Sequence, residues 1–171
     1  MKRFVQNLNT DEASHTLKTL LDENPDLLKK IYDCAVRVTA NVDAEDIADD
    51  VFSSLDILDY DDLNGRAGRT RHGYVEPGQA AWDLFEEALT PFINEMEKNH
   101  KRALPAVAKI YCIGIIKGLK RYEESSVSDL SDWLQDAPGE YIDTVVDEWK
   151  KGNPSDEDVA EVLNIVKGGL S

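Results

Sequence analysis

The chain has 171 residues, a formal net charge of −15 at pH 7 and an apolar content of 42%, which predicts a single folded domain over residues 1–171 rather than a disordered chain. Because so acidic a surface repels phosphate groups, general nucleic-acid binding is disfavoured. The longest apolar run, Ile110 to Ile116, is far shorter than the ~20 residues of a membrane-spanning helix, and the N-terminus has no apolar signal region, so we expect a cytoplasmic protein without a membrane partner.

Residues 10–55 have the apolar spacing of three amphipathic helices. Thr10 is expected to cap the first helix, and Asn24 followed by Pro25 is expected to begin the second. Asp43 is expected to cap the third helix, where the neighbouring acids suit the positive end of the helix dipole. In each helix the apolar side chains recur every three or four residues, so one face of each helix is expected to be buried.

Residues 56–78 interrupt this helical pattern. The stretch from Asp56 to Leu63 favours a short helix or a turn, and the glycines that follow it predict a flexible connector. Pro77 then precedes the next apolar pattern, which predicts a long helix. Pro91 lies inside that helix and is expected to kink it or to split it.

The most apolar helix is expected from Leu104 to Leu119, with apolar side chains on most of its faces. Such a helix belongs at the centre of a bundle or a solenoid. Its two glycines, Gly114 and Gly118, lie four residues apart on one side, and each costs about 1 kcal/mol relative to alanine. We therefore expect a neighbouring helix to approach closely at these glycines.

Three short helical segments complete the chain. Ser128 is expected to cap the first, Pro138 to begin the second and Ser155 to cap the last. Because no stretch alternates between apolar and polar residues, no sheet is expected. The predicted fold class is all-α, with about eight helices in an irregular bundle or a HEAT-like α-α superhelix. The superhelix alternative rests on one helix pair, residues 79–122, whose length of ~44 residues resembles a HEAT or armadillo unit.

Cysteine and tryptophan residues fall on apolar helical stripes. Both cysteines, Cys34 and Cys112, are therefore interpreted as buried thiols of a reducing compartment. Trp82, Trp133 and Trp149 are interpreted as core residues for the same reason. No disulfide and no redox pair is expected from these positions.

Patterns that would indicate catalysis or metal binding are weak. Two Glu-x-x-His steps, Glu12/His15 and Glu97/His100, resemble parts of a di-iron bundle site, but Glu12 and His15 fall opposite the leucine stripe of their helix, which favours surface pairs. Neither a G-x-S-x-G nor a Walker motif is present. We therefore predict no catalytic residue, no cofactor and no metal. A non-enzymatic role is favoured over the alternative, an enzyme whose general base lies in a pocket that only the fold would reveal.

Residues 64–74, NGRAGRTRHGY, form the most distinctive segment of the chain. They hold three of the seven arginines and no acid. The candidate residues for binding an anion or a partner are Arg66, Arg69, Arg71 and His72. Glycines allow a backbone to approach a ligand closely, and arginine binds phosphate and carboxylate groups through two parallel hydrogen bonds. Three interpretations stay open: pairing with acids of the same chain, docking to a partner, or binding a small anion.

These observations lead to a functional hypothesis with one alternative. We expect a non-catalytic, acidic helical protein that binds another protein, because an acidic surface steers association with partners. The alternative is an anion-binding protein or enzyme for a phosphate, a nucleotide or a carboxylate, with loop 64–74 beside a pocket and Lys109 or Lys117 adding positive charge. The oligomeric state is left open.

Overall fold

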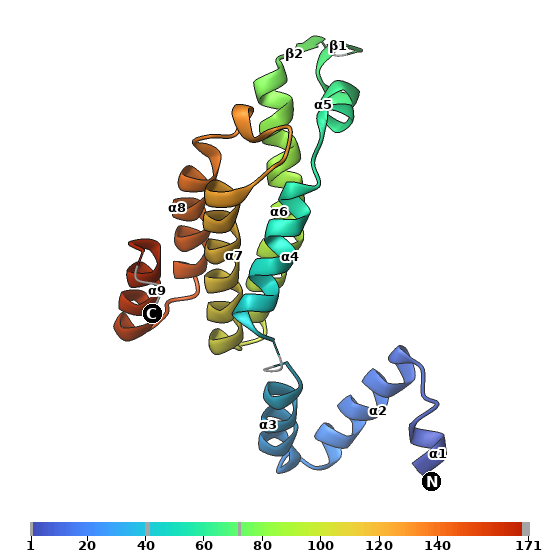
Figure 1. The fold of residues 1–171 in the computed structure, drawn as a ribbon. Helices are drawn as coiled ribbons and strands as arrows, with labels where there is room; N and C mark the ends of the chain where they lie inside the picture. Colours follow the sequence, from blue (N-terminus) through green and yellow to red (C-terminus); the bar gives the residue numbers. More distant parts are fainter. Residues whose placement is uncertain (1, 40–41, 72, 169–171) are drawn as a thin grey trace. The chain divides into compact units, whose positions relative to one another are not determined.

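The computed structural model describes residues 2–39, 42–71 and 73–168 (Figure 1). These residues form nine α-helices, one short 3-10 helix and one two-stranded hairpin, so the predicted all-α class with about eight helices is confirmed. Contacts within the chain divide it into two units, residues 1–41 and 42–171, and each is described by itself. No helix in the described ranges is long and apolar enough to span a membrane. The single domain and the HEAT-like superhelix stay predictions.

The first unit consists of α1 (Lys2–Val5), α2 (Thr10–Glu23) and α3 (Leu27–Thr39). Asn9 caps α2, one residue before the predicted cap, because its side-chain oxygen accepts a hydrogen bond from the backbone N–H of Glu12 at 2.9 Å. The Glu12 carboxylate accepts in return from the backbone N–H of Asn9 at 3.0 Å, which completes a capping box.

The apolar faces of the first unit are less buried than the sequence predicted. Leu17 and Leu20 on α2 are each 42% exposed, and Leu28 on α3 is 62% exposed. Cys34 is also exposed, so its interpretation as a buried thiol is wrong. The physical reason is that helices as short as α2 and α3 cover only part of each other's surface.

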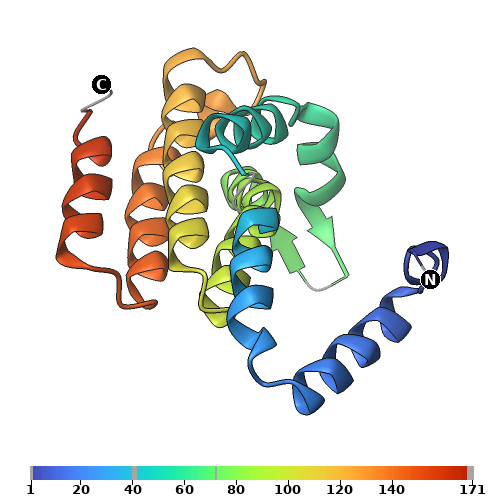
Figure 2. The same cartoon turned by 90° about the horizontal axis from the view of Figure 1, so that it is seen from below.

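The second unit is built around α7 (Pro105–Ser125). Four helices pack against it: α4 (Ala44–Asp56), α6 (Pro77–Lys101), α8 (Ala137–Lys150) and α9 (Asp156–Val166). Figure 1 shows α4, α6 and α8 beside α7, and Figure 2 shows α8 and α9 on one side of α7 with α4 and α6 on the other. Cys112, Ile115 and Leu119 of α7 are 0% exposed. The central position predicted for the most apolar helix is therefore confirmed, and Cys112 is a buried thiol as expected.

Gly114 and Gly118 allow α4 to lie directly against α7. A Cβ atom on Gly114 would lie 2.6 Å from the Cβ of Ile47, and one on Gly118 would lie 2.6 Å from the Cβ of Val51. Real Cβ atoms do not approach other carbons so closely, because non-bonded carbon atoms repel one another well inside their optimal separation of about 3.5–4.0 Å. The close helix contact predicted from these glycines is confirmed.

Helix α6 continues unbroken through Pro91 over its 25 residues. The predicted split at this proline therefore does not occur. Leu89 and Met96, on either side of the proline, are both 0% exposed, so the two halves of the helix are held by the same core. Burial of both halves outweighs the single backbone hydrogen bond that a proline removes.

The segment predicted as a flexible connector contains regular structure. It forms α5 (Tyr60–Arg66) and an antiparallel hairpin of β1 (Gly68–Thr70) and β2 (Gly73–Val75). The prediction that the chain has no strand is therefore wrong. Strands of three residues are too short to show an alternating pattern. Gly68 and Gly73 have φ angles of 95° and 137°, which glycine adopts far more readily than other residues.

A loop with a 3-10 helix, Ser131–Trp133, connects α7 to α8. Ser128 fixes the start of this loop, since its hydroxyl donates to the backbone carbonyl of Leu58 at 2.6 Å and accepts from the N–H of Leu130 at 3.2 Å. Trp133 is 47% exposed, so its assignment to the core is wrong. Ser155 caps α9 as predicted.

Candidate functional site

The arginine-containing segment is anchored at its base to the core of the second unit. Arg66 lies in the last turn of α5, where a cation suits the negative end of the helix dipole, and it forms an ion pair with Glu87 of α6. Ala67, just before the first strand, and Val75, at the end of the second, lie at the base of the hairpin and are half-buried against the core. The hairpin is therefore held in place by both polar and apolar contacts.

Two exposed side chains share one face of the hairpin. Arg69 and Tyr74 are directly paired across the two strands, and paired residues of an antiparallel ladder project to the same side. Arg69 is exposed and Tyr74 is 66% exposed. Arg71 is exposed in the turn between the two strands, whereas His72 lies outside the described residues. Among the residues that the structure describes, Arg69 and Arg71 have no ion-pair partner.

Lys109 and Lys117, which were expected to add charge beside this segment, are engaged elsewhere. The ammonium group of Lys109 lies 2.7 Å from Asp158 and 2.8 Å from Glu161, and hydrogen bonds to these carboxylates raise the pKa of Lys109. Lys117 lies 2.5 Å from Glu45, and this hydrogen bond is the main cause of the lowered pKa of Glu45. Both lysines thus tie helices of the second unit together.

The hairpin does not line any of the three main cavities of the second unit. These cavities have volumes of about 300, 240 and 60 Å³. None of the three is lined by residues 66–71 or 73–75. The described arginines thus line none of these three cavities, and Figure 1 shows the hairpin at one end of the second unit.

The 240 Å³ cavity contains the second Glu-x-x-His step. Glu97 and His100 line it together with Glu148 and Gly152. Burial lowers the pKa of His100, against the opposing effects of Glu97 and a backbone hydrogen bond with Trp149. Glu97 is engaged in an ion pair with Lys101 at 3.1 Å. His100 therefore links the end of α6 to α8, whereas Glu97 pairs within α6.

Cys112 offers no nucleophile at neutral pH. Its side chain is 0% exposed, and burial raises the pKa of the thiol to about 12. The thiolate is the reactive form of cysteine, so a thiol with so high a pKa is inert. The buried cysteine is a packing residue of α7.

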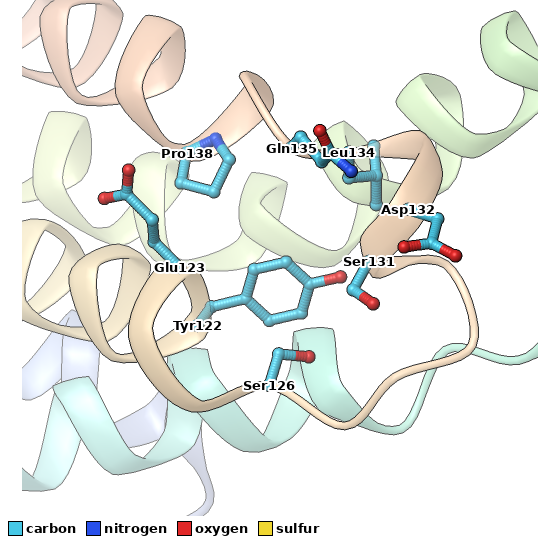
Figure 3. Close-up of a pocket in the computed structure, with 8 residues that line it drawn as sticks. All are labelled: Tyr122, Glu123, Ser126, Ser131, Asp132, Leu134, Gln135 and Pro138. Carbon is cyan, nitrogen blue, oxygen red and sulfur yellow. The ribbon is translucent and has the colours of Figure 1, made fainter.

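The largest of these three cavities was not predicted from the sequence (Figure 3). It has a volume of about 300 Å³ and lies where the C-terminus of α7 meets the 3-10 helix and the start of α8. Its lining residues are mostly polar: Tyr122, Glu123, Ser126, Ser131, Asp132, Leu134, Gln135 and Pro138. No motif marks them, because three separate elements contribute and their spacing follows no helical period.

Comparison with protein-family models, with curated proteins and with solved structures gave no significant match for this chain. No residue role is therefore transferred from another protein, and the functional argument rests on the geometry described above.

Proposed function

We propose that this protein is a non-catalytic, cytoplasmic interaction module that docks an acidic element of another protein through its β-hairpin. The observation that carries this proposal is the pairing of Arg69 with Tyr74 on one exposed face of an anchored hairpin. Arginine and tyrosine are enriched among residues that dominate binding energy at protein interfaces. A hairpin fixed at its base presents both side chains with little loss of conformational freedom on binding.

The contrast with other cations of the second unit supports this choice. Eight of the thirteen lysines and arginines in residues 42–171 form ion pairs within the described part of the chain. Arg66 is among the eight, whereas Arg69 and Arg71 are not. The second unit contains many carboxylates, yet neither Arg69 nor Arg71 pairs with one among the described residues. This favours docking to an external partner over pairing within the chain.

The alternative, a small-anion site, has less support. An anion pocket needs convergent groups around a concave surface, whereas the three main cavities lie away from the hairpin. The two free cysteines suit a reducing compartment such as the cytoplasm. The net charge of −15 supports a protein partner over nucleic acid because phosphate contacts dominate nucleic-acid affinity.

The test is an interaction measurement with paired variants of the full chain. Proteins crosslinked to the wild type in native lysate are identified by mass spectrometry, and the same capture is repeated with an Arg69→Ser/Arg71→Ser variant. We expect at least one partner to be lost or reduced about tenfold, since interface hot spots contribute roughly 2 kcal/mol or more. Arg66 is left unchanged because its ion pair with Glu87 anchors the hairpin.

The matched control is an Arg102→Ser/Lys167→Ser variant. Both residues are exposed and lie outside the hairpin, and the change in net charge is the same. If the control loses the same partners to the same extent, the association depends on overall charge and the hairpin proposal is wrong. If the hairpin variant retains every partner, the hairpin is not an interface.

A further inference from the structure

The 300 Å³ cavity contains a buried hydroxyl group without a hydrogen-bond partner. Tyr122 is 3% exposed, and its hydroxyl oxygen makes no hydrogen bond to any described residue. Figure 3 shows the ring of Tyr122 crossing the cavity, with the hydroxyl directed toward Ser131. Buried polar groups in native proteins are nearly always paired, so an unpaired hydroxyl at a cavity calls for a partner outside the chain, either a water molecule or a ligand group.

The hydroxyls of Ser126 and Ser128 interact with Tyr122 but donate their own protons to other acceptors. Burial raises the pKa of Tyr122, and the nearby hydroxyls of Ser128 and Ser126 oppose this shift. The Ser126 hydroxyl donates to the Asp56 carboxylate at 2.8 Å, and the Ser128 hydroxyl donates to the Leu58 carbonyl at 2.6 Å. Because these two hydroxyl protons are engaged elsewhere, the lone pairs of the Tyr122 oxygen are free to accept from a ligand.

The charges around the cavity are all negative. Glu123 and Asp132 line it, and no lysine or arginine does. Both carboxylates belong to exposed residues and make no ion pair within the described residues. Pro138 forms the border at the start of α8 and has no N–H group to offer an anion. The lining therefore provides hydrogen-bond acceptors for a positively charged donor.

We propose that this cavity binds the ammonium or guanidinium group of an organic cation, with Asp132 and Glu123 balancing its charge and the Tyr122 hydroxyl accepting one of its hydrogen bonds. The volume of about 300 Å³ is at the small end of ligand sites. Leu134 and Pro138 supply apolar surface for the carbon chain of such a cation. A metal ion fits less well, since the described residues contain no group of three or more His, Cys, Asp or Glu side chains that is able to hold one.

The experiment is an NMR titration of the full chain with n-butylamine and n-propylguanidine, which are cations at pH 7. The salt concentration is set at roughly 0.15 M, where charges more than about 8 Å apart are screened. We expect saturable shifts in the backbone amides of Ser126, Ser131 and Gln135. n-Butanol, of similar length but uncharged, is expected to bind at least about tenfold more weakly because charge-assisted hydrogen bonds are the stronger ones.

Three single variants decide whether the site is specific. Asp132→Asn is expected to weaken binding about tenfold, which corresponds to about 1.4 kcal/mol. Tyr122→Phe removes an unpaired hydroxyl and keeps the ring, so the fold is retained, and we expect a roughly threefold to tenfold loss of affinity. Asp129→Asn is the matched control, because this exposed acid lies in the same loop and does not line the cavity.

The outcomes are distinct. Losses confined to Asp132→Asn and Tyr122→Phe support the proposal. Equal losses in Asp132→Asn and Asp129→Asn would mean that the acidic surface merely attracts cations, and they would overturn it. Unsaturable shifts, or equal binding of n-butanol, would overturn it as well. Melting temperatures of the three variants confirm that the fold is intact.

A further arm identifies the source of the cation. The peptide Gly-Gly-Lys-Gly-Gly carries the same alkylammonium group on a flanked backbone. If the peptide binds as tightly as n-butylamine, the cavity accepts a basic side chain of another protein. If only the free amine binds, the cavity accepts a small amine. Either result supports a cavity that binds an alkylammonium group. If neither the peptide nor n-butylamine binds, the proposal is contradicted.

Discussion

Gly118 faces Val51 at one of two close contacts between α7 and α4. A Cβ atom at this position would lie 2.6 Å from the Cβ of Val51 and 2.9 Å from the carbonyl oxygen of Ala48. The second of these atoms belongs to the backbone, so it cannot move away without shifting α4. A single methyl group here therefore competes with the packing of two helices.

We expect Gly118→Ala to lower the free energy of unfolding by up to about 2 kcal/mol. Overpacking a core costs about 1–3 kcal/mol, and the gain of about 1 kcal/mol in helix propensity offsets only part of it. Urea denaturation followed by tryptophan fluorescence measures the change. Gly139→Ala is the control, because nothing lies within 4 Å of its added Cβ, and unchanged or higher stability is expected there. Equal effects of the two substitutions would contradict the packing argument.

Helix α9 is held against α7 by polar contacts as well as by its apolar face. Lys109 of α7 contacts both Asp158 and Glu161, and Lys120 donates to the backbone carbonyl of Ile165 at 2.7 Å. Val162 is the one α9 residue among those described that is fully buried. With so small an apolar anchor, the docking of α9 depends more on its ion pairs than the docking of α4 does.

We expect Lys109→Met to speed amide hydrogen exchange in α9 several-fold while leaving α4 unchanged. The hydrogen bond from Lys109 is the main cause of the lowered pKa of Asp158. A carboxyl whose pKa is lowered on folding stabilises the protein above its ordinary pKa, and this contribution is lost as the pH falls. Docking of α9 should therefore weaken as the pH falls below the ordinary value of 3.8.

The same variant tests the sign of this pH dependence. In Lys109→Met the pKa of Asp158, followed by NMR, should rise toward its ordinary value. The acid-induced loosening of α9 should then diminish, because a carboxyl with the same pKa in the folded and unfolded states makes stability independent of pH. Lys167→Met removes another exposed lysine for which no contact with Asp158 is found, and it serves as the control. An unchanged Asp158 pKa in Lys109→Met would contradict the assignment of this ion pair.

Charge and burial are distributed very unequally between the two units. Residues 1–41 contain six acids and six bases, so the net charge of −15 comes entirely from residues 42–171. The buried hydrophobic residues of the described chain also lie between Ile47 and Val162. The second unit therefore contains its own core.

We expect a fragment of residues 42–171 to fold by itself. It should unfold cooperatively with a melting temperature within about 5 °C of the full chain, since a change of 1 kcal/mol shifts the midpoint by roughly that much. Circular dichroism during heating measures this. A broad transition, or loss of helical signal at 25 °C, would show that residues 1–41 contribute to the core.

The candidate site illustrates the limits of sequence analysis. Arg69 and Arg71 stand out in an acidic chain because composition alone makes them unusual. The sequence did not predict the pairing of Arg69 with Tyr74, since strands of three residues leave no periodic signal. The cavity at Tyr122 was also missed, because its lining comes from three elements whose spacing in sequence says nothing about their distance in space.

The sequence by itself determined the all-α class, the central position of α7 and the close approach at Gly114 and Gly118. These features follow from local rules, since apolar periodicity and glycine spacing act within one helix. Only the tertiary structure decided that α6 runs through Pro91, that Trp133 is exposed and that a hairpin presents the arginines. The continuity of α6 and the exposure of Trp133 depend on how segments distant in the chain pack together, which local patterns do not reveal. The hairpin pairs neighbouring residues, but its strands are too short to leave a periodic signal.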